Sequence, residues 1–152
     1  MISKDANDEV VIVGLSRTPI GNFQGELSEL TGPELGGSAI KSAINKSKIM
    51  PSDVDDVIMG CVLPAGIGQA PARQAALNGS IPLSAGATTI NKMCGSGMRS
   101  VMIAVDQLVA GSSRVTVAGG FESMTNAPYL LDKARSGYRM GNNKVYDHMF
   151  LD

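Results

Sequence analysis

The sequence has 152 residues, a length typical of one compact domain and sufficient to bury a core. Its formal net charge is −1, from 13 basic and 14 acidic residues. With no basic cluster, it lacks the signature of a nucleic-acid-binding or anionic-membrane-binding protein. No apolar run approaches the roughly 18 residues of a membrane-spanning helix, and the start is not typical of a signal or transit peptide. We therefore expect a cytoplasmic protein with no nucleic-acid or membrane partner.

Cysteine and histidine are scarce, whereas glycine is abundant. The two cysteines, Cys61 and Cys94, are too few for a disulfide framework. Together with the single histidine, His148, they cannot complete a four-ligand zinc site, so we expect no metal. Glycine occurs 18 times, about 12% of the chain, against an average near 7%. The positions of the glycines therefore bear on function.

The first half of the chain predicts a strand, a helix and a second strand. Residues 10–14 (Val-Val-Ile-Val-Gly) form a β-branched run typical of a buried parallel strand. Thr31 and Glu34 have the spacing of a capping box, with a proline in the first turn, which predicts a helix start. The apolar residues that follow recur on one stripe of that helix. A second strand is predicted over residues 57–63.

The second half continues the alternation. Residues 69–78 predict a short Ala-rich helix, residues 88–93 a third strand and residues 114–120 a fourth. Between the last two strands, a helix is predicted to begin at residues 94–97 and to end before Gly111 as its C-cap. This helix is nearly apolar all round, so we expect burial on more than one side. The order β-α-β-α-β-α-β predicts an α/β fold with a mostly parallel sheet and right-handed crossovers.

Cys94 lies where the third strand passes into this helix. Free backbone N–H groups and the positive end of the helix dipole stabilise a thiolate at such a position. Gly95 and Gly97 leave room for a substrate and offer N–H groups to an oxyanion, so Cys94 is a candidate nucleophile toward an acyl or thioester carbonyl. The alternative is a buried cysteine that only packs. Cys61, inside an apolar strand, is interpreted as packing, and His148 as a surface histidine rather than a general base for Cys94.

Several segments, in order along the chain, resemble the thiolases, the acetyl-CoA acetyltransferase family. Residues 91–98 (Asn-Lys-Met-Cys-Gly-Ser-Gly-Met) are similar to the nucleophile motif of the family. Residues 17–21 (Arg-Thr-Pro-Ile-Gly) resemble its amino-terminal loop, and residues 57–60 its second strand. Residues 119–129 resemble the segment that leads into its substrate-covering loop domain. The resemblance spans residues 10–152.

The resemblance implies a thiolase-like amino-terminal half-fold over residues 1–120 and a truncated start of the loop domain over residues 121–152. It implies that Cys94 attacks acetyl-CoA, holds the acetyl group as a thioester and transfers it to a second acetyl-CoA, or catalyses the reverse thiolysis of acetoacetyl-CoA. The Cys94 N–H would contribute to an oxyanion hole. Further implications are a homo-oligomer, a role in fatty acid metabolism and no resident cofactor, since coenzyme A thioesters are the substrates.

Thiolases also use a later asparagine, a later histidine and a second cysteine, and no matching motifs occur in these 152 residues. Neither Cys61 nor His148 lies in such a motif, so turnover by this chain alone is left open. One alternative is a catalytically silent fragment or dimerisation module, because the apolar helix after Cys94 lacks a covering layer in a lone half-fold. A ketoacyl synthase, with the same architecture and a cysteine nucleophile, is disfavoured by residues 91–97 and 122–129.

Overall fold

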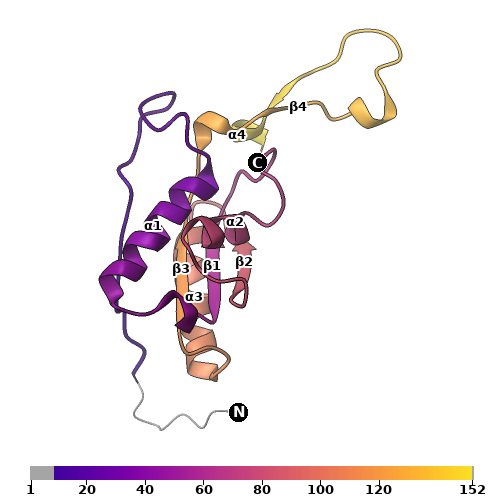
Figure 1. The fold of residues 1–152 in the computed structure, drawn as a ribbon. Helices are drawn as coiled ribbons and strands as arrows, with labels where there is room; N and C mark the ends of the chain where they lie inside the picture. Colours follow the sequence, from indigo (N-terminus) through magenta and orange to yellow (C-terminus); the bar gives the residue numbers. More distant parts are fainter. Residues whose placement is uncertain (1–8, 152) are drawn as a thin grey trace.

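A three-stranded parallel sheet forms the centre of the computed structural model, which describes residues 9–151 (Figure 1). Strand β1 (Asp56–Gly60) lies in the middle, between β2 (Gly86–Ile90) and β3 (Thr116–Gly120). Each pair is in register over its whole length. The carboxyl ends of the three strands therefore lie together at one edge of the sheet.

Helices cover both faces of this sheet (Figure 1). On one face, α1 (Gly32–Ser47) packs against α2 (Pro71–Asn78), which in turn contacts β1 and β2. On the other face, α3 (Ser96–Ala110) packs against β3 and β1. Alternate side chains of a strand point to opposite faces, and Val57 and Met59 of β1 belong to the hydrophobic core that α1 and α2 complete. The predicted α/β half-fold with a parallel sheet is confirmed.

Local signals for the helix ends are also confirmed. The Thr31 hydroxyl accepts a hydrogen bond from the Glu34 N–H, and the Glu34 carboxylate accepts one from the Thr31 N–H at 2.8 Å. This capping box starts α1. The helix α3 ends at Gly111, which adopts a left-handed conformation with φ of 71°. Because glycine has no Cβ, this C-cap conformation costs it little.

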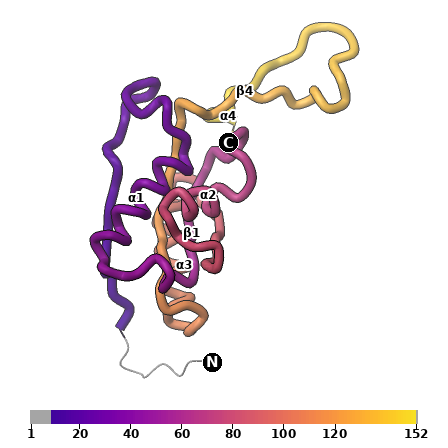
Figure 2. Tube along the Cα trace, viewed as in Figure 1, coloured from indigo at the N-terminus to yellow at the C-terminus, as the bar shows by residue number. Residues whose placement is uncertain are grey.

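The predicted strand over residues 10–14 is wrong for the described structure. The segment is extended but belongs to no strand, and its apolar side chains are exposed, with Ile12 79% accessible. It lies along α1, where a Cβ on Gly14 would meet the Ala43 carbonyl oxygen at 2.5 Å (Figure 2). A groove of about 360 Å³ separates it from β3. A β-branched run needs a hydrogen-bonded partner to become a strand, and none of the described strands pairs with this one.

The expected burial of α3 on more than one side is also wrong. Its buried residues, Ser96, Ser100 and Ala104, lie on the side that packs on the sheet. The apolar residues elsewhere on the helix are 40–73% exposed: Met98, Val101, Met102, Val105 and Val109. Within residues 9–151, no element covers that side, so the apolar composition of α3 does not result in burial.

The chain after β3 forms short elements and a projecting arm (Figures 1 and 2). The strands β4 (Tyr129–Leu130) and β5 (Tyr146–Asp147) pair antiparallel at the base of the arm, and α4 (His148–Leu151) follows. The part of the chain that the structure describes also contains the 3-10 turns η1 (Pro51–Asp53), η2 (Met124–Asn126) and η3 (Ala134–Ser136). None of the helices described is long and apolar enough to cross a membrane. The domain boundary at residue 120 stays a prediction.

Candidate active site

Cys94 is exposed in the turn that connects β2 to α3. Strand β2 ends at Ile90, three residues earlier than predicted, so the turn occupies residues 91–95. Met93, immediately before the cysteine, has a positive φ of 50°. A residue with a Cβ is strained in this region and stays there only when its surroundings hold it. The turn that presents Cys94 is therefore a constrained one.

Side-chain hydrogen bonds supply this constraint. The Asn91 side-chain oxygen accepts a hydrogen bond from the Met93 N–H at 2.8 Å. The Ser96 hydroxyl accepts from the Lys92 N–H at 2.8 Å and donates to the Met93 carbonyl at 2.6 Å. Gly95, the N-cap of α3, provides no side-chain cap, and the Ser96 N–H donates to the Met93 carbonyl at 3.0 Å. Asn91 and Ser96 thus hold the turn that leads into α3.

Close packing fixes α3 against the sheet at the same place. A Cβ on Gly60 of β1 would lie 2.6 Å from the Ser96 backbone. A Cβ on Gly120 of β3 would lie 3.2 Å from the Gly97 Cα. The fully buried Ser100 hydroxyl lies 2.6 Å from the Gly97 carbonyl oxygen and 2.7 Å from the Gly119 carbonyl oxygen. The first turn of α3 therefore rests directly on the carboxyl ends of β1 and β3.

Cys61 is buried in the core, which confirms its interpretation as a packing residue. Its Sγ nevertheless lies 3.6 Å from the Glu122 carboxylate and donates a weak hydrogen bond to it. Burial, with the negative charge of Glu122 and this hydrogen bond, raises the pKa of Cys61 to about 12. Cys61 is therefore a protonated thiol at neutral pH and is excluded as a nucleophile or as a base.

His148 is not the surface residue that the sequence predicted. It is 3% exposed and begins α4, and its backbone N–H donates to the Pro128 carbonyl at 3.3 Å. The return of β5 alongside β4 places it beneath the base of the arm, and this contact between distant segments has no local signal in the sequence.

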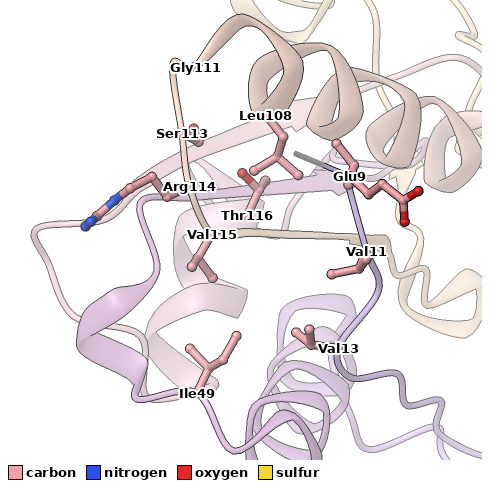
Figure 3. Close-up of a pocket in the computed structure, with 11 residues that line it drawn as sticks. Glu9, Val11, Val13, Ile49, Leu108, Gly111, Ser113, Arg114, Val115 and Thr116 are labelled. Carbon is pink, nitrogen blue, oxygen red and sulfur yellow. The ribbon is translucent and has the colours of Figure 1, made fainter. Parts of the chain in front are cut away.

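Two cavities of the described structure lie away from Cys94. One is at the amino-terminal end of β3, where Glu9, Val11, Leu108 and Arg114 surround it (Figure 3). The other is the groove between residues 10–16 and β3. Neither is lined by residues 91–97. The candidate site is therefore defined by the exposed Cys94 thiol at the start of α3 and not by either of these cavities.

The sequence predicted Cys94 as a candidate nucleophile but did not predict the residues that hold its turn. Asn91 and Ser96 lie in the motif around Cys94, yet their backbone partners depend on the conformation of the turn. Glu122 lies in the segment that resembles thiolases, and no role was assigned to it. Its carboxylate contacts the chain 60 residues earlier, at Val62, and such a long-range contact leaves no periodic signal.

Comparison with known proteins identifies the family. Residues 10–152 match the family model of the thiolase N-terminal domain. The chain is 47% identical to acetyl-CoA acetyltransferase of Cupriavidus necator, over 95% of this chain and 37% of that protein. It is 51% identical to acetyl-CoA acetyltransferase IB of Candida tropicalis, over 94% and 36%, and 50% identical to acetyl-CoA acetyltransferase of Escherichia coli, over 93% and 36%. It spans little more than a third of these curated relatives. The chain belongs to the thiolase family.

Proposed function

We propose that Cys94 is the acetyl-accepting nucleophile of an acetyl-CoA C-acetyltransferase. The observation that carries this proposal is the accessible thiol in a strained turn, directly before the uncapped amino end of α3. The names of the similar proteins support acetyl-CoA as the substrate. The other thiol, Cys61, is buried and protonated, so within the described residues Cys94 alone offers a reactive sulfur.

In the first step, the Cys94 thiolate attacks the carbonyl carbon of acetyl-CoA. Negative charge develops on the carbonyl oxygen, and we expect backbone N–H groups beside Cys94 to stabilise it. The intermediate then collapses, and the bond between the carbonyl carbon and the coenzyme A sulfur breaks. Coenzyme A leaves as a thiolate and takes up a proton, while the acetyl group remains on Cys94 as a thioester.

In the second step, another acetyl-CoA loses a proton from its methyl group to a general base, and the resulting carbanion attacks the Cys94 thioester. The bond to the Cys94 sulfur breaks, which regenerates the thiolate and gives acetoacetyl-CoA. Thiolysis runs the same steps in reverse. The reaction needs no resident cofactor, because the thioester itself activates the acetyl group. Cys61 cannot be the general base, because its pKa of about 12 keeps it protonated.

The wider setting is also proposed: a cytoplasmic homo-oligomer that acts in fatty acid metabolism. The exposed apolar face of α3 supports association of copies. The same face favours the second candidate function, a catalytically silent dimerisation module. The two candidates differ in whether Cys94 reacts with acetyl-CoA.

Release of free coenzyme A from acetyl-CoA tests the proposal. The native chain and the Cys61→Ser variant are expected to release about one equivalent, because both keep the nucleophile. The Cys94→Ser variant is expected to release none on the same time scale. Chromatographic measurement of coenzyme A gives the readout. No release by native chain that is folded by circular dichroism would favour the silent module.

A further inference from the structure

The Glu122 side chain connects the carboxyl ends of β1 and β3 beyond the last backbone hydrogen bond between the two strands. The last backbone bond runs from the Phe121 N–H to the Gly60 carbonyl at 3.0 Å. Beyond this bond, each oxygen of the Glu122 carboxylate accepts a hydrogen bond from a backbone N–H of residues 62–63, which follow β1 in the chain. Oε2 accepts from Val62 at 2.8 Å, and Oε1 accepts from Leu63 at 3.0 Å. Glu122 therefore extends the β1–β3 connection beyond the sheet.

This connection continues to the turn that carries the nucleophile. The Val62 carbonyl accepts a hydrogen bond from the Asn91 side-chain nitrogen at 3.4 Å. The Asn91 side-chain oxygen accepts from the Met93 N–H at 2.8 Å. Met93 has the strained, positive φ and directly precedes Cys94. Hydrogen bonds through Val62 and Asn91 thus link Glu122 to the residue before the nucleophile.

We propose that Glu122 is a positioning residue for Cys94. Its carboxylate fixes the backbone at Val62 and Leu63, and this backbone orients Asn91, which holds Met93 in its strained conformation. The proposal rests on the proposed function, because it assumes that Cys94 accepts an acetyl group. Acyl transfer requires the sulfur to be aligned with both the carbonyl carbon and the oxyanion donors, so a small displacement slows it.

A second carboxylate gives a matched control. At the amino ends of the same two strands, Asp55 Oδ2 accepts the N–H groups of Arg114 at 2.7 Å and Val115 at 3.1 Å. Asp55 and Glu122 thus both connect β1 to β3 through two backbone N–H groups. They lie at opposite ends of the sheet, and only Glu122 is at the end from which α3 and Cys94 start.

The Glu122→Gln variant separates positioning from general stability. Glutamine has nearly the same size, but its side chain has one oxygen and one NH₂ group. One of the two N–H donors, at Val62 or Leu63, then faces another donor and loses its acceptor. The Asp55→Ala variant removes both side-chain hydrogen bonds of Asp55 and leaves the backbone bond from its N–H to the Val115 carbonyl, so it removes more of the side-chain connection than Glu122→Gln does.

The test combines three measurements on the native chain and both variants: the rate of Cys94 acetylation by acetyl-CoA, unfolding by urea, and amide hydrogen exchange over residues 91–95. We expect Glu122→Gln to slow acetylation about tenfold or more and to speed exchange in the turn. Asp55→Ala is expected to lower stability while leaving both turn readouts at native values. Adding Asn91→Ala to Glu122→Gln should slow acetylation little further, because both residues belong to the same chain of hydrogen bonds.

Three results would overturn the proposal: native acetylation and exchange in Glu122→Gln, an equal loss of acetylation in Asp55→Ala, or additive losses from Glu122 and Asn91. If the native chain takes up no acetyl group, the proposed function fails by itself. Hydrogen exchange then decides whether Glu122 holds the turn. Faster exchange over residues 91–95 in Glu122→Gln, but not in Asp55→Ala, supports positioning, and unchanged exchange contradicts it.

Discussion

At the scale of single residues, the two cysteines show how surroundings determine the reactivity of the same thiol. Cys94 is exposed in the turn that leads into α3. Cys61 is 2% exposed and lies next to the Glu122 carboxylate, whose negative charge disfavours the thiolate form of Cys61. Because the thiolate is the reactive form, exposure makes Cys94 accessible to reagents, whereas burial and the Glu122 charge suppress chemistry at Cys61.

We therefore predict that iodoacetamide modifies Cys94 and leaves Cys61 unmodified in the folded chain. Cys61 should react only after unfolding, because the core excludes the reagent and keeps its proton bound. Peptide mapping by mass spectrometry measures both sites. The Cys94→Ser variant is the control and should take up no label under native conditions. Labelling of Cys61 at a rate similar to Cys94 would contradict this assignment.

The raised pKa of Cys61 also predicts a loss of stability in alkaline solution. Its pKa is about 12 in the folded chain, against a reference of 9.0. The folded state thus binds this proton more tightly, so its contribution to stability is complete below about pH 9 and declines as pH rises toward 12. Urea unfolding of native chain and Cys61→Ala measures this. The difference in unfolding free energy between them should shrink from about pH 8 to about pH 10, and a constant difference would contradict the shift.

At the scale of elements, the contact of α3 with the sheet depends on Gly60. A Cβ there would lie 2.6 Å from the Ser96 backbone, so Gly60→Ala forces the first turn of α3 to move. We predict that it lowers the unfolding free energy by about 1–3 kcal/mol, as overpacking does. Gly97→Ala is the control, because its Cβ would have no neighbour closer than 3.8 Å. Urea unfolding of both variants gives the comparison, and equal stabilities would disprove the close contact.

The exposed apolar face of α3 predicts self-association. Its four most central residues, Met98, Val101, Met102 and Val105, are 40–73% exposed. Light scattering after size-exclusion chromatography should show dimers or larger species, and Met102→Lys with Val105→Glu should shift them toward monomer. Leu83→Lys, at a residue that is 79% exposed on another part of the surface, is expected to have no effect. A monodisperse native monomer would contradict the prediction.

The elements that the sequence predicted well are those with local causes. The capping box at Thr31 and the terminal Gly111 act within a few residues, so they define α1 and α3 directly. Residues 10–14 and the outer face of α3 were predicted to be buried because they are apolar. An apolar composition shows that a segment could be buried. Burial also requires a second element that covers the segment, and none of the described elements covers the apolar side chains of either one.

At the scale of the whole molecule, the place of Cys94 in the fold was predictable from the sequence, and the contacts that hold its turn were not. The carboxyl ends of the parallel strands meet at one edge, and the passage from β2 to α3 places Cys94 there. The contacts that hold this turn join residues far apart: Glu122 with Val62, and Val62 with Asn91. Such contacts depend on strand order and register, which a single sequence does not specify.

The central claim is that Cys94 accepts an acetyl group, and intact-mass spectrometry after incubation with acetyl-CoA tests it most directly. The native chain should gain the mass of one acetyl group, and peptide mapping should place it on Cys94. The Cys94→Ser variant should gain no mass, and Cys61→Ser should behave as the native chain does. An acetyl group on another residue, or no gain by the folded native chain, would contradict the account.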